Sequence, residues 1–425
     1  MMRASSTPMH AGSRATSSSA TCLWIGRYVP YPINEGMKLY SAKLVESVAR
    51  SGIFVRALGF GDLAHAPAIK GVQWIAISGE RGRDLSGIVN RLPLAAAVDA
   101  TPEYKDLLDR QLREHWDVIV FDSYASGWAL DRCRRYRTAQ NTQALLVHVS
   151  HNHETAVWRS MAQHSNASPV HRWLMRRNAI KVAQLERDLA TNVDLVTTIT
   201  DEDANALSTT SNAAPTLTLM PGYDGPIAAP RMIAYRTPRR VVIVGSFNWV
   251  VKRENLTRFV QHADPIFARH DIELLVAGEM PEELRTSLEA KCRASTFRGF
   301  VSDLAPLLAE SRIAIVPELI GGGFKLKFLD YFFGRVPVAT VSAAAAGVPA
   351  ALREQLLMGE DIAALTQTIV EHIDDLDELN RRQATVFEQA TTLFRWEDRG
   401  AQLHSELDAL RAKRWDTEDH RLLGS

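Results

Sequence analysis

The sequence predicts an α/β protein of two parallel-sheet domains, and three observations carry this prediction. With 425 residues, the chain exceeds one ordinary core and suits two domains of roughly 150 to 200 residues each. Short β-branched apolar runs alternate with helical patterns in both halves, as βαβ units require. Residues 226–239, which contain three prolines, have the composition of a linker. We therefore expect two Rossmann-like domains, at 21–225 and 240–390.

The composition excludes several other classes of protein. Hydrophobic residues make up 46% and charged residues 23%, which is typical of a soluble globular protein. Lys plus Arg and Asp plus Glu both number 49, so no basic excess favours a nucleic-acid partner. The 3 cysteines lack metal-type spacing, and they are interpreted as reduced thiols of a cytoplasmic protein. No apolar run reaches the about 18 residues of a membrane span.

The first 20 residues are rich in Ser, Thr and Ala and have no apolar core, so they are not a secretory signal. We interpret residues 1–20 as a disordered tail or as residues upstream of the true start, with a transit-like peptide as a further alternative.

The first half opens with a βαβ unit. Residues 21–27 and 53–59 are strand-like, and residues 36–50 carry apolar positions at the helical period. The loop that ends at Gly36 is interpreted as a turn that needs glycine, or as bare backbone that faces a ligand. The remaining predicted elements of this half are helices at 85–98, 104–115, 126–136 and 170–190, and strands at 117–121, 145–149, 194–199 and 216–220.

The strand at 145–149 leads into a dense polar cluster that contains His151, Asn152 and Glu154. Polar groups just past the carboxyl end of a parallel strand lie where open α/β sheets bind ligands. The histidines here do not share the i, i+4 spacing of a helical metal site, so metal binding is the weaker hypothesis. The alternative is a loop histidine with no role in binding, followed by Asn152 as a helix cap.

The helix at 170–190 carries cations on successive turns, which suits contact with anionic lipid or a lipid-linked diphosphate acceptor. An ordinary solvated face has the same pattern.

The second half opens with a strand at 240–244 and a glycine, and a helix then begins around Lys252 and Arg253. Cations in a first helical turn oppose the helix dipole, so they indicate a bound anion unless they are simply solvated. The further predicted elements are strands at 271–276, 296–298, 313–316 and 336–341, and helices at 282–294, 361–374 and 379–410.

Three glycines at 321–323 stand between the strand at 313–316 and a helix that ends at Gly334. Glycines ahead of a helix let an anion approach bare amides. Lys327 near the helix start adds a positive charge, and Asp330 on the same face suits sugar hydroxyls. The stretch predicts a binding site for a nucleotide diphosphate. The alternative is a turn before a buried helix that carries a Lys–Asp pair on its surface.

Together these motifs resemble retaining glycosyltransferases of family four, which have the GT-B fold. The resemblance spans most of the chain and rests on segments at 30–36, 151–158, 220–224, 245–255, 299–303 and 321–337. It implies two Rossmann-like domains whose parallel sheets face each other across a cleft. The first domain would be on the acceptor side and the second would bind the nucleotide sugar. Residues 391–425 would form a helix that crosses back to the first domain, and a tail.

The resemblance also implies roles for single residues. Asp330 stands where the family usually has a ribose-binding Glu, and Gly322 stands where another Glu holds the donor sugar. The implied catalytic residues are His151, Lys252 and Lys327. The implied donor-binding residues are Gly36, Arg253, Phe300, Val301, Gly322, Gly323, Phe324 and Asp330. The implied acceptor-side residues are Asn152 and Glu154.

The function implied by the resemblance is that of a retaining, metal-independent hexosyltransferase without a cofactor. It would move a sugar from a UDP- or GDP-sugar to a hydroxyl of a glycan or lipid-linked acceptor, in cell-surface polysaccharide or glycoconjugate synthesis. We expect it in the cytoplasm, with peripheral contact at the inner face of the membrane, and without a nucleic-acid partner. The alternatives are a non-catalytic nucleotide-sugar-binding protein and a GT-B sugar-nucleotide epimerase.

Overall fold

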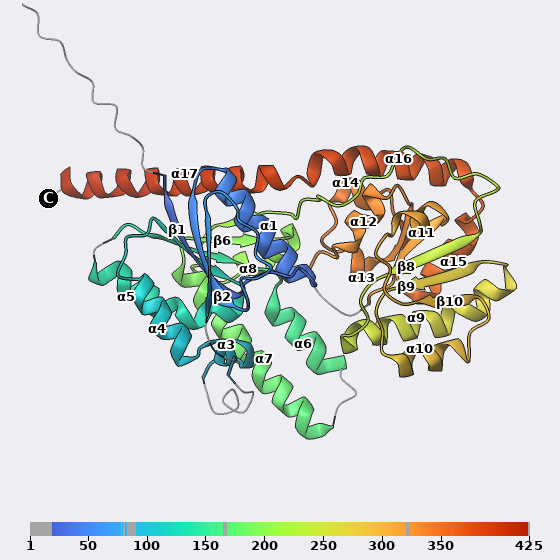
Figure 1. The fold of residues 1–425 in the computed structure, drawn as a ribbon, viewed down its shortest axis with the longest axis horizontal. Coiled ribbons are helices and arrows are strands. Elements are labelled where there is room, and N and C mark those ends of the chain that lie inside the picture. Colours follow the sequence, from blue (N-terminus) through green and yellow to red (C-terminus); the bar gives the residue numbers. More distant parts are fainter. Residues whose placement is uncertain are drawn as a thin grey trace, which may run out of the picture.

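The computed structural model describes residues 19–77, 79, 81–82, 91–140, 142–164, 168–319 and 323–423. Two sheets, one in each half of the chain, lie side by side with helices packed around them (Figure 1). The first has the strand order β3-β2-β1-β4-β5-β6-β7 and the second β10-β9-β8-β11-β12-β13. Every pairing between described strands is parallel. The predicted α/β fold with two parallel sheets is confirmed.

The first sheet and its helices come from residues 21–218. Its strands are β1 Thr21–Tyr28, β2 Phe54–Phe60, β3 Val72–Ile77, β4 Val118–Asp122, β5 Leu145–Val149, β6 Leu195–Thr198 and β7 Thr216–Thr218. Its helices are α1 Gly36–Arg50, α3 Leu94–Asp99, α4 Pro102–Gln111, the 3₁₀ helix η1 Tyr124–Ala129, α5 Leu130–Ala139, α6 Glu154–His164, α7 Pro169–Asn192 and α8 Asp201–Ser208.

The second sheet begins at residue 240, after a stretch without helices or strands from residue 219. Its strands are β8 Arg240–Val244, β9 Glu273–Ala277, β10 Ser295–Arg298, β11 Ile313–Val316, β12 Val338–Val341 and β13 Leu357–Gly359. Its helices are α9 Val250–Arg269, α10 Glu282–Glu289, α11 Ala305–Ala309, α12 Lys327–Phe333, α13 Ser342–Ala345, α14 Ala350–Arg353, α15 Ile362–His372 and α16 Leu376–Leu393, and α17 Trp396–Leu423 follows.

Some elements differ from the sequence prediction. Residues 72–77, where no element was predicted, form the edge strand β3, because pairing with β2 overrides a weak local pattern. The helix predicted at 126–136 starts as η1 and becomes regular only at Leu130. The helix predicted at 379–410 is divided at Phe394, where α16 ends. Of the helix predicted at 85–98, residues 85–90 lie outside the described residues.

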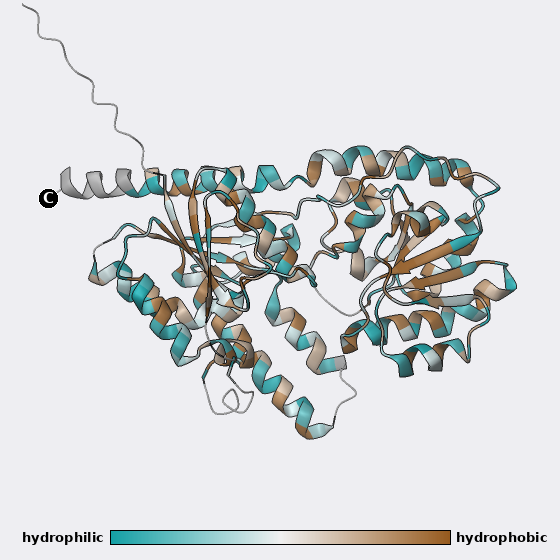
Figure 2. Cartoon of the chain, viewed as in Figure 1, coloured by the Kyte–Doolittle hydropathy of each residue, from teal (hydrophilic) through white to brown (hydrophobic). Residues whose placement is uncertain are grey.

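The first sheet is covered on both faces, and successive residues of β1 show why. Leu23 and Ile25 join the buried cluster beneath α4 and α7, whereas Cys22 and Trp24 join the cluster beneath α1 and α17. This alternation is the period of a strand. The apolar colouring concentrates on the strands and on the inner sides of the helices (Figure 2).

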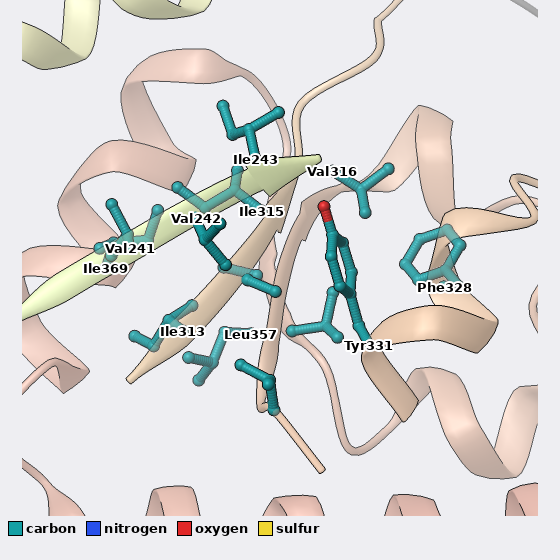
Figure 3. Close-up of a cluster of buried hydrophobic side chains, with 14 of the residues drawn as sticks. Val241, Val242, Ile243, Ile313, Ile315, Val316, Phe328, Tyr331, Leu357 and Ile369 are labelled. Carbon is teal, nitrogen blue, oxygen red and sulfur yellow. The ribbon is translucent and has the colours of Figure 1, made fainter. Parts of the chain in front are cut away.

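The second sheet has one continuous core. Val241, Val242 and Ile243 of β8 pack with Ile313 and Ile315 of β11, and Phe328 and Tyr331 of α12 stand beside them (Figure 3). The Tyr331 hydroxyl accepts a hydrogen bond of 2.8 Å from the Val244 amide. Strand β8 and helix α12 are thereby fixed to each other at the end of the sheet where β8 stops.

The chain crosses between the two halves twice, and the two crossings touch. The Tyr223 amide donates to the Phe394 carbonyl at 2.9 Å, and a Cβ added at Gly222 would stand 2.3 Å from the Trp396 nitrogen. Beyond the second crossing, α17 lies along α1 of the first half (Figure 1), where the Gly400 amide donates to Ser47 Oγ at 2.7 Å. No helix in the described part of the chain is long and apolar enough to cross a bilayer.

Candidate active site

A cleft of about 650 Å³ lies between the two halves. In both sheets the strand order reverses between two neighbours, β1 and β4 in the first and β8 and β11 in the second. Crevices at the carboxyl ends of such strands are the usual ligand sites of open α/β sheets. The cleft lies at these ends. Its lining includes the predicted site residues Gly36, His151, Asn152, Lys252, Phe300, Phe324 and Lys327.

On the first-domain side, His151 is held by a carboxylate. Its Nε2 lies 2.6 Å from Oδ1 of Asp122, which ends β4, and Trp24 Nε1 donates to the other Asp122 oxygen at 2.9 Å. Burial opposes the charged form of Asp122, but the adjacent His151 and the hydrogen bonds hold its pKa below the usual range. His151 is therefore an oriented side chain beside an anion, and its ring packs edge-to-face with Tyr40, with the ring centroids 5.3 Å apart.

Asn152 and Glu154 follow His151, and the structure corrects the capping interpretation. The Asn152 side chain donates to Glu154 Oε1 at 3.1 Å and accepts no helix amide that the structure describes. The amides of Glu154 and Thr155 instead donate to the carboxylate of Glu186, a buried residue of α7. Burial raises the pKa of Glu154 to about 7; Asn152 lowers it and the negative charge of Glu186 raises it further.

On the opposite side, lysines gather around one carboxylate. Lys327 Nζ lies 2.5 Å from Oε1 of Glu318, which follows β11. Burial lowers the pKa of Lys252, and the charge of Lys327 lowers it further, while Glu318 and Glu35 oppose this. A Cβ added at Gly245, after β8, would stand 3.3 Å from Lys327 Nζ. The glycine turn after β8 thus leaves room for the lysine.

Glu318 and Lys325 line the cleft as well, although neither was predicted as a site residue. Lys325 Nζ donates to the Gly323 carbonyl at 3.0 Å, and burial lowers its pKa, opposed by Glu318. Glu318 is 8% exposed, and its Oε2 has no hydrogen-bond partner among the described residues. The sequence feature that could have identified Glu318 as a site residue is its position just after the carboxyl end of a buried parallel strand.

The glycine loop contacts the first domain directly. Gly323 has φ +67°, and a Cβ there would stand 2.0 Å from Asn152 Oδ1. A Cβ at Gly36 would stand 2.9 Å from Leu326 Cδ1. Helix α12 begins only at Lys327, so the three glycines do not directly precede the helix, and the expectation that they lie at its N-terminus is wrong. Gly322 lies outside the described residues.

Four predicted donor-binding residues that the structure describes, Gly323, Arg253, Val301 and Asp330, are not part of the cleft lining. Asp330 lies beside Tyr223, and burial raises its pKa to about 6, while Tyr223 and Lys327 lower it. It is half-buried, so the interpretation as a surface Lys–Asp pair does not describe it. Arg253 and Val301 flank Lys252 and Phe300, which do line the cleft. Among the described residues no three His, Cys, Asp or Glu side chains gather as metal ligands.

Comparison with known proteins bears on both halves of the chain. Residues 238–375 match the family model for glycosyl transferases group 1. Sucrose-phosphate synthase from Thermosynechococcus elongatus is a similar solved structure, with 18% identity, a TM-score of 0.67, and coverage of 93% of this chain and 100% of that one.

Two other similar structures have lower scores. HepE from Anabaena, solved in complex with UDP-glucose, has 14% identity, a TM-score of 0.56, and coverage of 92% and 99%. WaaG, a glycosyltransferase involved in lipopolysaccharide biosynthesis, has 16% identity, a TM-score of 0.57, and coverage of 90% and 99%. No curated protein matches the sequence. The chain therefore has the GT-B fold, and the match to the glycosyl transferases group 1 model lies in its second half.

Proposed function

We propose that this protein is a retaining glycosyltransferase that moves a sugar from a UDP- or GDP-sugar to a hydroxyl of a glycan or lipid-linked acceptor. The observation that carries the proposal is the cleft itself, where Lys252 and Lys327 face a first-domain wall that holds His151. The group 1 match over the second half supports sugar transfer, and the similar HepE structure contains UDP-glucose.

The difficult step in this reaction is the departure of the nucleoside diphosphate, which gains negative charge as the glycosidic bond breaks. Lys252 and Lys327 would stabilise that charge, because fixed cations in a partly desolvated cleft interact more strongly than in water. His151 would contact the reacting sugar, with Asp122 holding its ring. In the retaining reaction that we propose, the acceptor hydroxyl attacks from the face that the diphosphate leaves, and closure of the two domains excludes water.

Replacement of Lys327 tests the proposal. Lys327→Ala should weaken UDP binding by roughly tenfold or more, because a charge-assisted contact to a phosphate is lost. His151→Ala should leave the UDP dissociation constant unchanged and reduce turnover. Isothermal titration with UDP gives the first quantity, and release of UDP from a panel of nucleotide sugars gives the second.

Lys291→Ala is the matched control, because Lys291 is an exposed lysine of the same domain. Equal UDP affinity in the wild type and Lys327→Ala would contradict the proposal. Tight binding of UDP-sugars without turnover on any acceptor would instead support the non-catalytic nucleotide-sugar-binding protein.

We also propose that the protein contacts the inner face of a membrane through α7. This helix exposes Val170, Trp173 and Ile180, at 69%, 56% and 71%. Arg172, Arg176 and Arg177 are exposed on the same half of the helix. Apolar side chains interleaved with cations suit the boundary between lipid headgroups and acyl chains.

A further inference from the structure

Three cations surround one aromatic ring on the first-domain side. Arg27 and Tyr28 end β1, Lys38 lies in the first turn of α1, and Arg81 follows β3. The charged groups of Arg27, Lys38 and Arg81 lie 5.4, 5.4 and 4.8 Å from the centre of the Tyr28 ring. Neither the proposed donor site nor the His151–Asp122 pair uses this cluster.

The cluster has more positive charge than the ion pairs of the described residues neutralise. Asp99, 1% exposed, accepts from Arg27 Nε at 2.8 Å and from Arg81 Nε at 2.7 Å. Among the described residues, Asp99 is the carboxylate that forms ion pairs with this cluster of three cations. Lys38 makes no ion pair within the described part of the chain, and Asp122 is already paired with His151. Arg27 uses only Nε toward Asp99, and no described residue pairs with its two terminal nitrogens, which are placed to bind an anion.

The arrangement is also organised before any ligand arrives. Asp99 fixes the planes of both guanidinium groups, and the Tyr28 hydroxyl accepts from Arg81 at 2.5 Å. Like charges this close repel one another, and an anion with two negative charges would relieve the repulsion. A planar guanidinium with parallel N–H groups matches the oxygens of a phosphate.

The position relates the cluster to the reaction. Arg27, Tyr28, Lys38 and Ser41 line a small hollow together with Asp122, whose other side holds His151. The hollow lies at the carboxyl ends of β1 and β4, where the first sheet reverses its strand order. It is therefore on the acceptor side of His151, across the cleft from the lysines.

We propose that Arg27, Lys38 and Arg81 bind a phosphate group carried by the acceptor, so that the acceptor is a phosphorylated sugar. This rests on the proposed function and adds the class of acceptor. The phosphate belongs either to a soluble sugar phosphate or to a lipid-linked sugar diphosphate. The hollow itself has a volume of only about 10 Å³, so both would place the anion at its mouth, against the three cations, with a sugar hydroxyl toward His151.

The test measures binding of phosphorylated probes with the donor site filled. With saturating UDP, the wild type should bind glucose 6-phosphate at least about tenfold more tightly than glucose. Lys38→Gln should remove at least about tenfold of that affinity, and Lys70→Gln, an exposed lysine elsewhere on the first domain, should not. Arg81→Gln is a second variant that should also bind glucose 6-phosphate more weakly. Because Asp99 loses an ion-pair partner in this variant, its unfolding temperature is measured to confirm that it folds.

A second arm uses phosphatidylcholine vesicles that contain polyprenyl diphosphate-linked glucose. If the protein binds glucose 6-phosphate and Lys38→Gln weakens that binding, the acceptor is a soluble sugar phosphate. If the protein binds only these vesicles and Lys38→Gln weakens that binding, the acceptor is a lipid-linked sugar diphosphate. Binding of neither probe, or binding that is equal in wild type and Lys38→Gln, would overturn the proposal. UDP affinity is measured separately, so loss of the donor site and loss of the phosphate site give different results.

Discussion

Glu318 supplies the proposed donor site with a carboxylate that the sequence motif lacks. At Gly322, where the resembling family has a carboxylate for the donor sugar, this chain has none. Glu318 brings a carboxylate into the cleft from the end of β11 instead, with one oxygen on Lys327 and the other without a described partner. A buried acceptor of this kind is costly unless it meets a donor. A sugar hydroxyl would supply one.

Glu318→Gln should therefore separate binding from turnover. UDP should bind up to about fivefold more tightly, because the variant lacks a carboxylate that competes with phosphate for Lys327, an effect of about 1 kcal/mol. Transfer from the nucleotide sugar should slow, because Gln cannot accept as strongly from a sugar hydroxyl. Titration with UDP gives the dissociation constant, and steady-state kinetics give the rate of sugar transfer. Glu283→Gln, an exposed carboxylate of α10, is the control, and weaker UDP binding in Glu318→Gln would contradict this role.

Glu154 predicts a pH dependence of stability. Its pKa is raised from an ordinary 4.5 to about 7 by burial. Between these values the unfolded chain releases the proton and the folded protein keeps it, so stability falls as pH rises through this window and is unaffected below it. Glu154→Gln removes the penalty, which is at most about 3 kcal/mol.

The gain in unfolding temperature from Glu154→Gln should accordingly be larger at pH 8 than at pH 4. Calorimetry at several pH values measures it, with Glu354→Gln as an exposed control. A gain that is the same at both pH values would show that folding does not raise the pKa of Glu154.

At the scale of elements, α7 combines two roles along its length. Toward its end, Val182, Leu185 and Leu189 are buried in the first-domain core, whereas its beginning leaves Trp173 and Ile180 exposed. Arg177 lies 5.5 Å from the Trp173 ring. The buried half anchors the exposed half, so the beginning of the helix is a rigid surface rather than a loose tail.

Replacing the apolar residues of this surface should weaken membrane binding. Trp173→Ser and Ile180→Ser should each reduce sedimentation with phosphatidylglycerol vesicles by roughly tenfold, because a large side chain no longer leaves water. Added salt should also reduce the sedimentation of the wild type with these vesicles, because it screens the attraction between the arginines and the anionic lipid. Tyr235→Ser, at an exposed aromatic residue away from α7, should have no effect. Equal sedimentation of all variants would exclude α7 as the contact.

The sequence predicted elements well where the pattern was local. Helix 36–50 and strand 145–149 have the predicted bounds, because both carry a clear period and end at a turn. Edge strand β3 and the short β13 depend on a neighbouring strand for their pairing and were missed. In the site, lysines and glycines stood out by motif, but Asp122 acts through a contact with a residue 29 positions away. Such pairs become visible only when the sheet order is known.

At the scale of the whole molecule, the two domains are tied on one side and meet across the cleft on the other. The tie is formed by the crossings at 222–223 and 394–396, and α17 fastens it to α1 through Ser47 and Gly400. On the cleft side, the Gly323 loop touches Asn152. A molecule built this way can open by bending at the tie and parting at the glycine loop.

Gly323→Ala should hold the domains apart. The added methyl would stand 2.0 Å from Asn152 Oδ1, at a φ of +67° that also disfavours alanine. UDP should still bind, because the lysines belong to the second domain, but turnover should fall at least about tenfold as the two walls no longer meet. Small-angle scattering with UDP should give a larger radius of gyration than for the wild type. In Gly323→Ala with Asn152→Ala the obstructing oxygen is gone, so the compact form should return while the cost of the backbone conformation remains. A radius unchanged in the single variant would mean that this contact does not limit closure.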